Sequence, residues 1–381
     1  MGTRPELGPP RRARAASASA GSARPAAESD LIPALLAWFA SARRDLPWRR
    51  DRDAYRVWIS ESMLQQTRVE AVIPYFERFL ARFPTVADLA AAPVEDVLAA
   101  WSGLGYYRRA RALHEAARAV LERHGGAFPS AREDLLALPG VGPYTAGAVA
   151  SIAFDRPERL VDGNVARVLA RLYAIEAPQE SAVFRARTWE HAGLLVADLA
   201  GRSAGEWNQA LMELGALVCV PREPRCLACP VQARCRALER GLTSELPVPK
   251  RRPTAIEVEL HVAIVRSGDR WLVQQRPATG RMAGLWELPT VEPSGARLLA
   301  GPDWPDARGA TPAIALGDEL GTLSHSITRH RIRVRVFEAR WLAGDPEAPL
   351  DFASRAQIAE LGPTGLTAKI LRAPFARATA R

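Results

Sequence analysis

Two carboxylates in the 381-residue chain have surroundings that could give them different acid–base behaviour. Glu61 lies in WISESMLQQTRVE, residues 58–70, a largely apolar stretch with helical spacing. If that glutamate is buried, desolvation raises its pKa and allows it to act as a general acid near neutral pH; an exposed, solubilising glutamate is the alternative. Asp162 directly precedes the amphipathic sequence GNVARVLARL, where it would cap a helix. A carboxylate at a helix N-terminus is expected to have a lowered pKa and to stay ionised, as stabilising a cationic reaction intermediate requires.

All four cysteines lie within one short stretch, with gaps of six, two and five residues between Cys219, Cys226, Cys229 and Cys235. Four clustered thiolates suit an iron–sulfur cluster, and a structural zinc ion is the alternative. Arginines alternate with these cysteines, so the closed loop would present positive charge to phosphates; they are Arg222, Arg225, Arg234 and Arg236.

A glycine-rich segment, LPGVGPYTAGAVAS, occupies residues 138–151. Gly140 and Gly142 predict a tight turn before a helix of small residues, where backbone N–H groups can approach a phosphate. An ordinary glycine-rich connection between helices is the alternative.

Length and composition indicate the class of protein. With 48% hydrophobic residues, the chain is long enough for two globular domains. Its formal net charge of +9 favours a polyanionic partner such as nucleic acid; the alternative is that the base composition of the genome produces the bias toward alanine and arginine. No apolar run reaches the length of a membrane span. We therefore expect a cytoplasmic protein with no membrane partner, associated with the nucleoid if the source is bacterial.

The elements that must position these residues change in character along the chain. Residues 1–28 predict a disordered basic tail, and residues 29–240 have helical periodicity throughout. Asp30 is a candidate cap for the first helix. The proline-containing residues 241–254 predict a linker, and residues 255–372 show strand-like alternation in IEVELHVAIV, RWLVQQRP, LWELPTVE and RIRVRVFEARW, with one helix near 353–361 and a tail from 373 to 381.

Several of these motifs resemble the MutY-type adenine DNA glycosylases of the endonuclease III superfamily. SESMLQQT, residues 60–67, closely resembles the family's SEVMLQQT segment, and residues 138–151 look like its helix-hairpin-helix. The cysteine gaps resemble its [4Fe-4S] loop. The resemblance implies that Glu61 protonates adenine and then handles the water, that Asp162 stabilises or transiently bonds the sugar carbon, and that Tyr144 and Asn164 orient them.

The same resemblance implies which residues contact the lesion. After base flipping, side chains must fill the gap in the duplex; the matching positions are Gln66, Thr67, Leu104 and Tyr106. Helix packing is the alternative role for Tyr106. Tyr144 stands where endonuclease III enzymes carry a Schiff-base lysine, and the first 249 residues contain no lysine. We therefore expect a monofunctional enzyme.

The C-terminal region resembles the MutT-like recognition domain of the same family in QQRPATGRMAGLWELP, residues 274–289. That resemblance implies a Nudix-like fold. The sequence after Glu287 lacks the closely spaced glutamates that hold magnesium, which predicts no pyrophosphatase activity. LSHSITRHRIRV, residues 323–334, resembles the family's 8-oxoguanine loop with Ser324 and His325 as readers, although Leu323 replaces the usual phenylalanine. An ordinary β-hairpin is the alternative.

The sequence thus predicts a mainly α, two-lobed helix-hairpin-helix glycosylase domain with a [4Fe-4S] loop, joined to a smaller α/β Nudix-like domain. The expected enzyme is a monomer that hydrolyses the N-glycosidic bond of adenine in duplex DNA containing A:8-oxoG or A:G mispairs. Two rivals are an endonuclease III-like pyrimidine glycosylase and lyase, and a catalytically silent binder of damaged DNA.

Overall fold

A computed structural model of the chain describes residues 30–250, 254–277, 282–291, 314–327, 329–342, 345–346 and 349–374. The predicted basic tail, residues 1–28, and nearly all of the tail predicted from residue 373 lie outside the described residues.

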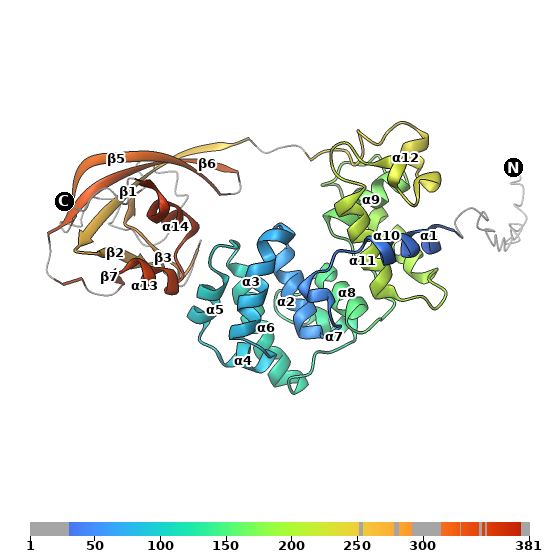
Figure 1. Cartoon of the computed structure of the whole chain (residues 1–381), viewed down its shortest axis with the longest axis horizontal. Helices are drawn as coiled ribbons and strands as arrows, with labels where there is room; N and C mark the ends of the chain where they lie inside the picture. The colour runs from blue at the N-terminus through green and yellow to red at the C-terminus, as the bar shows by residue number, and fades with distance from the viewer. Residues whose placement is uncertain are drawn as a thin grey trace, which may run out of the picture.

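The residues from 31 to 239 form helices arranged in two lobes (Figure 1). One lobe contains α2 to α8, and the other contains α1 and α9 to α12, with α11 packed on both α8 and α9. The helices are α1 (Leu31–Ala42), η1 (Pro47–Arg49), α2 (Ala54–Leu64), α3 (Val69–Arg82), α4 (Val86–Ala91), α5 (Val94–Trp101), α6 (Arg108–His124), α7 (Arg132–Leu136), α8 (Pro143–Ile152), α9 (Gly163–Leu172), α10 (Ala182–Ala197), α11 (Ala204–Leu217), η2 (Cys226–Ala228), η3 (Gln232–Arg234) and α12 (Arg236–Glu239).

Local signals explain several helix ends. Gly125 adopts the left-handed conformation that ends α6, and the side chain of Asp162 accepts a hydrogen bond from Val165 N–H at 2.7 Å to cap α9. The predicted cap at Asp30 is wrong. Asp30 does occupy the N-cap position of α1, but it has helical backbone angles and its side chain makes no capping hydrogen bond; the carboxylate lies 3.5 Å from the guanidinium of Arg234. None of the helices in the described ranges is long and apolar enough to cross a bilayer.

The C-terminal domain contains a mixed sheet with strand order β3-β2-β1-β6-β5, in which β1 and β6 are parallel and the other neighbours antiparallel. In addition, β4 pairs with β1 and β7 with β2. The elements are β1 (Ile256–Ser267), β2 (Arg270–Gln275), β3 (Trp286–Glu287), β4 (Thr290–Val291), β5 (Ile314–Ile327), β6 (His330–Trp341), β7 (Leu350–Ala353), α13 (Arg355–Glu360) and α14 (Gly365–Arg372). Together with the helical domain, this sheet confirms the predicted fold class.

The segment predicted as a linker contacts the helical domain along part of its length. Leu246 is buried, and its carbonyl accepts a hydrogen bond from the buried Arg171 side chain at 2.8 Å. Further on, Val248 O accepts a hydrogen bond from Gln179 N–H at 3.2 Å. The described residues 242–250 therefore form a strap over the helical domain.

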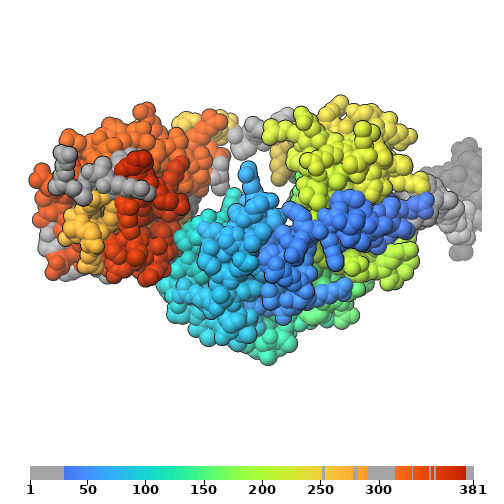
Figure 2. All heavy atoms as spheres, viewed as in Figure 1, coloured from blue at the N-terminus to red at the C-terminus, as the bar shows by residue number. Residues whose placement is uncertain are grey.

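The two domains contact each other directly as well. Leu285, from the C-terminal domain, is fully buried in the hydrophobic core of the helical domain, and Met282 packs against that core. Arg111 on α6 donates a hydrogen bond to Ala283 O. Figure 2 shows this contact where the sheet-containing domain meets the helical domain, and a recess between the sheet-containing domain and the lobe of α9 to α12.

Candidate active site

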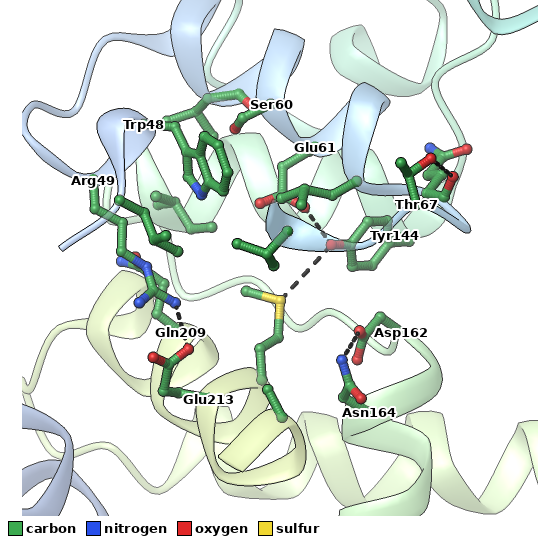
Figure 3. A pocket seen from close by; sticks show the side chains of 18 of the residues that line it. Trp48, Arg49, Ser60, Glu61, Thr67, Tyr144, Asp162, Asn164, Gln209 and Glu213 are labelled. Atoms are coloured by element: carbon green, nitrogen blue, oxygen red, sulfur yellow. Dashed lines mark hydrogen bonds and ion pairs between the residues drawn. The ribbon is translucent and has the colours of Figure 1, made fainter. Parts of the chain in front are cut away.

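A cavity of about 480 Å³ lies where the two helical lobes meet. Its walls come from η1, α2, α8, α9 and α11, and its lining includes Glu61, Tyr144, Asp162 and Asn164 (Figure 3). The structure therefore brings all four predicted catalytic residues to one site.

Glu61 is 4% exposed although it is acidic, because α2 presents nearly all of its residues to the protein interior. Its carboxylate accepts a hydrogen bond from the Tyr144 hydroxyl. Burial and, to a smaller extent, the nearby charge of Asp162 outweigh that hydrogen bond and the charge of Arg49, and the pKa of Glu61 rises to about 7. The exposed-glutamate alternative is thus wrong, and the carboxyl group is suited to general-acid chemistry near neutral pH.

Asp162 departs from the sequence prediction in one respect. It caps α9 as expected and also accepts a hydrogen bond from the Asn164 side chain at 3.1 Å, but burial raises its pKa above the usual value. The predicted lowering is wrong because desolvation in the cavity exceeds the stabilisation by the N–H groups and by the charge of Arg167. Those contacts still favour the anion at Asp162, whereas Glu61 accepts a single side-chain hydrogen bond.

Tyr144 and Asn164 connect these carboxylates to their surroundings. Tyr144, on α8, points toward Glu61 and also lies 3.7 Å from the sulfur of Met212 (Figure 3). Asn164 is held by Arg167, whose guanidinium donates to Asn164 Oδ1 at 2.8 Å and to the carbonyl of Cys219 at 2.8 Å. Both residues therefore fix the orientation of the carboxylates.

A charged cluster on the opposite wall was not predicted from the sequence. Glu213, which has a 1% exposed side chain, accepts hydrogen bonds from Arg44 at 2.8 and 2.9 Å and from Arg49 at 3.0 Å. Although burial opposes ionisation, these arginines lower the pKa of Glu213 to about 2. A signal existed, since Glu213 sits in the apolar segment ALMELGAL just as Glu61 sits in an apolar helix.

The glycine-rich turn joins α7 to α8. Gly140 has φ of +70°, and a Cβ there would lie 2.5 Å from the Cβ of Ala112, so both the backbone and the packing require glycine. Gly142 has φ of −95° and open space around it. It caps α8 next to Pro143, which leaves the N-terminus of that helix free to face a phosphate.

The four predicted duplex-contact residues of this domain lie in two loops. Gln66 and Thr67 follow α2, and Leu104 and Tyr106 lie between α5 and α6. Leu104 is buried, whereas Tyr106 is 51% exposed, which argues against a purely packing role for its ring. Gln66 and Tyr106 have positive φ values of 59° and 50°, an uncommon conformation for side-chain-bearing residues that often marks functional loops.

Arg109 connects the two loops. It donates hydrogen bonds to the carbonyls of Ser62 and Gln65 at 2.8 and 2.6 Å, and its guanidinium lies over the ring of Tyr106, 5.2 Å from the centroid. This contact holds both loops in one arrangement.

The four cysteines surround a single small cavity of about 30 Å³ beside Arg171. Arg171 donates a hydrogen bond to Cys219 Sγ at 3.3 Å. Burial raises the pKa of Cys229 to about 11, and the charges of the other three cysteines contribute to that rise, so bringing four thiolates together requires a compensating cation. In the described part of the chain, no group of three or more His, Cys, Asp or Glu side chains is arranged to hold a single metal ion. An all-sulfur donor set around one cavity fits a thiolate-bound cluster.

The C-terminal candidates lie on a strand rather than in a free loop. Ser324 and His325 belong to β5 and pair with Arg333 and Ile332 of β6. Ser324 is exposed and His325 half-buried. Elsewhere in the same domain, on β3, Glu287 is bound by Arg276 at 2.6 Å and is buried, so its carboxylate is already neutralised by an arginine. The absence of pyrophosphatase activity stays a prediction.

Comparisons with known proteins agree with this geometry. Residues 59–191 match the HhH-GPD superfamily of base excision DNA repair proteins, and residues 261–373 match the NUDIX domain. An adenine DNA glycosylase of Rattus norvegicus is 42% identical over 350 residues, which cover 76% of this chain and 67% of the relative. The adenine DNA glycosylase of Homo sapiens is 40% identical over 352 residues, covering 76% and 64%. A solved structure of a thermostable thymine-DNA glycosylase is 29% identical, with a TM-score of 0.50, and the match covers 56% of this chain and 97% of that one.

The helical fold, the carboxylate-lined cavity and these matches define a DNA N-glycosylase of the helix-hairpin-helix class with an appended Nudix-like domain. The identity to the rat relative, over two thirds of its length, narrows the assignment. The chain belongs to the adenine DNA glycosylase family.

Proposed function

We propose that the protein excises adenine mispaired with 8-oxoguanine or guanine. The observation that carries this proposal is the placement of Glu61, Tyr144 and Asp162 around one cavity, with the more readily protonated carboxyl group and the more anion-stabilised one both facing it. The names of the relatives support adenine as the base. The cavity of about 480 Å³ can accept a nucleobase removed from the duplex.

In the proposed reaction, protonated Glu61 gives its proton to a ring nitrogen of the flipped adenine. The bond between that base and the sugar carbon then breaks, and its electron pair leaves with the base. Asp162, as the anion, stabilises the cationic sugar or transiently bonds its carbon. Water adds to the sugar carbon and loses a proton to the Glu61 carboxylate, which restores the acid.

We further propose that the enzyme is monofunctional. A lyase step of the endonuclease III kind needs a lysine amine near the sugar, and the helical domain has none. Tyr144 contributes a hydroxyl to Glu61 instead. Any strand break at the abasic site should therefore require added alkali.

The four cysteines support a [4Fe-4S] cluster as the bound group. It would be held by Cys219, Cys226, Cys229 and Cys235, and its role would be to fix the loop that positions the domain on DNA. Iron and acid-labile sulfide measured on protein purified without oxygen should each give four equivalents per chain. One equivalent of zinc, without iron, would replace this assignment with a structural zinc site.

The proposal about 8-oxoguanine rests on the exposed strand edge at Ser324 and His325, together with the exposed ring of Tyr106. It is tested by incubating the protein with duplexes containing A:8-oxoG, A:G or thymine glycol and comparing strand breaks before and after alkali. We expect breaks in the two adenine duplexes only after alkali. Thymine glycol cleavage, or trapping by borohydride, would instead support the pyrimidine lyase.

Glu61→Gln should abolish excision while preserving binding to the A:8-oxoG duplex, because the amide has a similar shape but no proton to give. Glu77→Gln, on an exposed site of α3, is the matched control and should keep full activity. Excision by Glu61→Gln at the parental rate would remove the acid assignment. If the parent protein binds the duplexes but excises no base from them, only the catalytically silent binder of damaged DNA remains as an interpretation.

A further inference from the structure

The two sets of residues that we place on the lesion lie in different domains, and a short helix connects them. Ser324 and His325 are on β5 of the C-terminal domain, and Tyr106 is in the loop before α6 of the helical domain. The connecting helix is α14, whose first turn follows Pro363.

At its far end, α14 contacts the lesion-reading strand. Lys369 donates a hydrogen bond to the carbonyl of Ser324 at 2.6 Å. Burial and then the charge of the same lysine lower the pKa of His325, which shows that the ammonium group acts on that side chain too. Lys369 is one of only two lysines in the chain.

At its near end, the segment before α14 contacts the loop that carries Tyr106. The carbonyl of Pro363 accepts hydrogen bonds from Ser102 Oγ at 3.2 Å and from the Tyr107 hydroxyl at 3.4 Å. The same hydroxyl accepts a hydrogen bond from Gly103 N–H at 3.3 Å. Tyr107 therefore bridges the C-terminal domain and the loop just before the exposed tyrosine.

Between these ends the structure is rigid. Leu366 and Ile370 are buried in the core of the sheet-containing domain, and Thr364 caps the helix. Thr364 N–H also donates to Trp286 O at 2.8 Å, which fixes the start of α14 to β3. From Gly365 to Lys369 the helix rises by about 6 Å. A packed element of this kind keeps the separation of its two ends constant.

We propose that α14 sets the position of the lesion-reading strand relative to the loop carrying Tyr106, and that Tyr107 and Lys369 are positioning residues that determine the preference for 8-oxoguanine over guanine. The inference rests on the proposed function. Neither residue lines the catalytic cavity, so the chemistry itself does not depend on them.

The test compares single-turnover excision from A:8-oxoG and A:G duplexes by the parent, Tyr107→Phe, Lys369→Gln and the double variant. Each single change should reduce the ratio of the two rates about fivefold, the effect of one hydrogen bond, and leave the A:G rate unchanged. Because both changes break one linkage, the double variant should lose little more than the worse single variant.

Matched controls separate positioning from general destabilisation. Tyr55→Phe removes another buried tyrosine hydrogen bond, to Phe83 O at 2.8 Å, and Lys250→Gln removes the other lysine charge; both should keep the parental ratio. Lys369→Arg retains a hydrogen-bond donor at this position and should therefore keep the parental ratio of the two excision rates.

An unchanged ratio in both single variants would overturn the inference, and so would losses that simply multiply in the double variant. If the parent excises adenine but shows no preference for 8-oxoguanine, the inference falls while the adenine activity stands. If the parent excises no adenine, the proposed function itself fails.

Discussion

At the scale of single residues, Glu61 is held where its ionised form is disfavoured. Its pKa of about 7, against an ordinary value of 4.5, means that the folded protein binds a proton that the unfolded chain releases at neutral pH. A pKa raised on folding gives stability that is present below about pH 4.5 and is lost as pH rises through about 7. The acid that the proposed reaction requires thus costs the protein stability near neutral pH.

Glu61→Gln should therefore be more stable than the parent above pH 7, by about 3 kcal/mol, because the neutral amide removes the cost of burying a charge. Below about pH 4.5, where both forms are neutral, the two unfolding free energies should agree. Urea unfolding at several pH values measures this difference. Equal stability at pH 8 would show that Glu61 is not buried as an anion.

The rate of excision should follow the same ionisation. Because the reaction that we propose needs protonated Glu61, single-turnover excision should fall tenfold per pH unit above about pH 7. A pH–rate profile on the A:8-oxoG duplex measures it. A rate that stays level to pH 9 would assign the proton to another group.

At the scale of elements, the turn between α7 and α8 separates two roles of glycine. Gly140 is required by its backbone and by Ala112, whereas Gly142 has neither constraint. The sequence suggested the same role for both glycines. It could not distinguish them, because the backbone angle φ and the packing at each position depend on how α6 lies against the turn.

Gly140→Ala should destabilise the protein by roughly 2 kcal/mol, since it forces a Cβ onto a left-handed residue and into Ala112. Gly142→Ala should leave the melting temperature unchanged and weaken binding to duplex DNA, because its Cβ would occupy the open space next to the α8 N-terminus. Thermal unfolding and DNA titration of both variants provide the comparison. Equal losses of stability would contradict it.

Elements with clear periodicity were predictable, and those without were not. VEDVLAAW coincides with α5, and RIRVRVFEARW lies within β6. In contrast, the first part of β5 was missed because GDELG interrupts its alternation, whereas its end, residues 323–327, was predicted only by the alternative β-hairpin, which the pairing of β5 with β6 confirms. The helix α14, which is only eight residues long, was missed as well. The direction of the Asp162 pKa was wrong because cavity desolvation comes from helices remote in sequence. For the same reason, the pairing of Glu213 with Arg44 and Arg49 in the cavity wall became evident only from the structure, because those arginines are remote from it in sequence.

At the scale of the whole molecule, the contact between the domains is part of a hydrophobic core. Leu285 is fully buried among the helical residues, whereas its neighbour Leu288 is buried in the core of the sheet. Residues three positions apart thus stabilise different domains, which links the stability of α5 and α6 to the C-terminal domain.

Leu285→Ala should speed amide hydrogen exchange in α5 and α6, because a cavity opens beneath them at a cost of about 3 kcal/mol. Leu288→Ala should speed exchange in the strands and leave those helices protected. Mass spectrometry of the exchanged peptides distinguishes the two. Identical exchange patterns would show that the domains unfold as a single unit.

The strap formed by residues 242–250 has a practical consequence for dissecting the enzyme. A fragment truncated at Arg240, the residue after α12, would lack Leu246. One N–H of the Arg171 guanidinium, next to the cysteine loop, would then have lost its acceptor. A fragment that keeps the cysteine loop intact should therefore extend through the strap to Lys250. A protease that cuts within the strap would loosen the cysteine loop before it separates the domains.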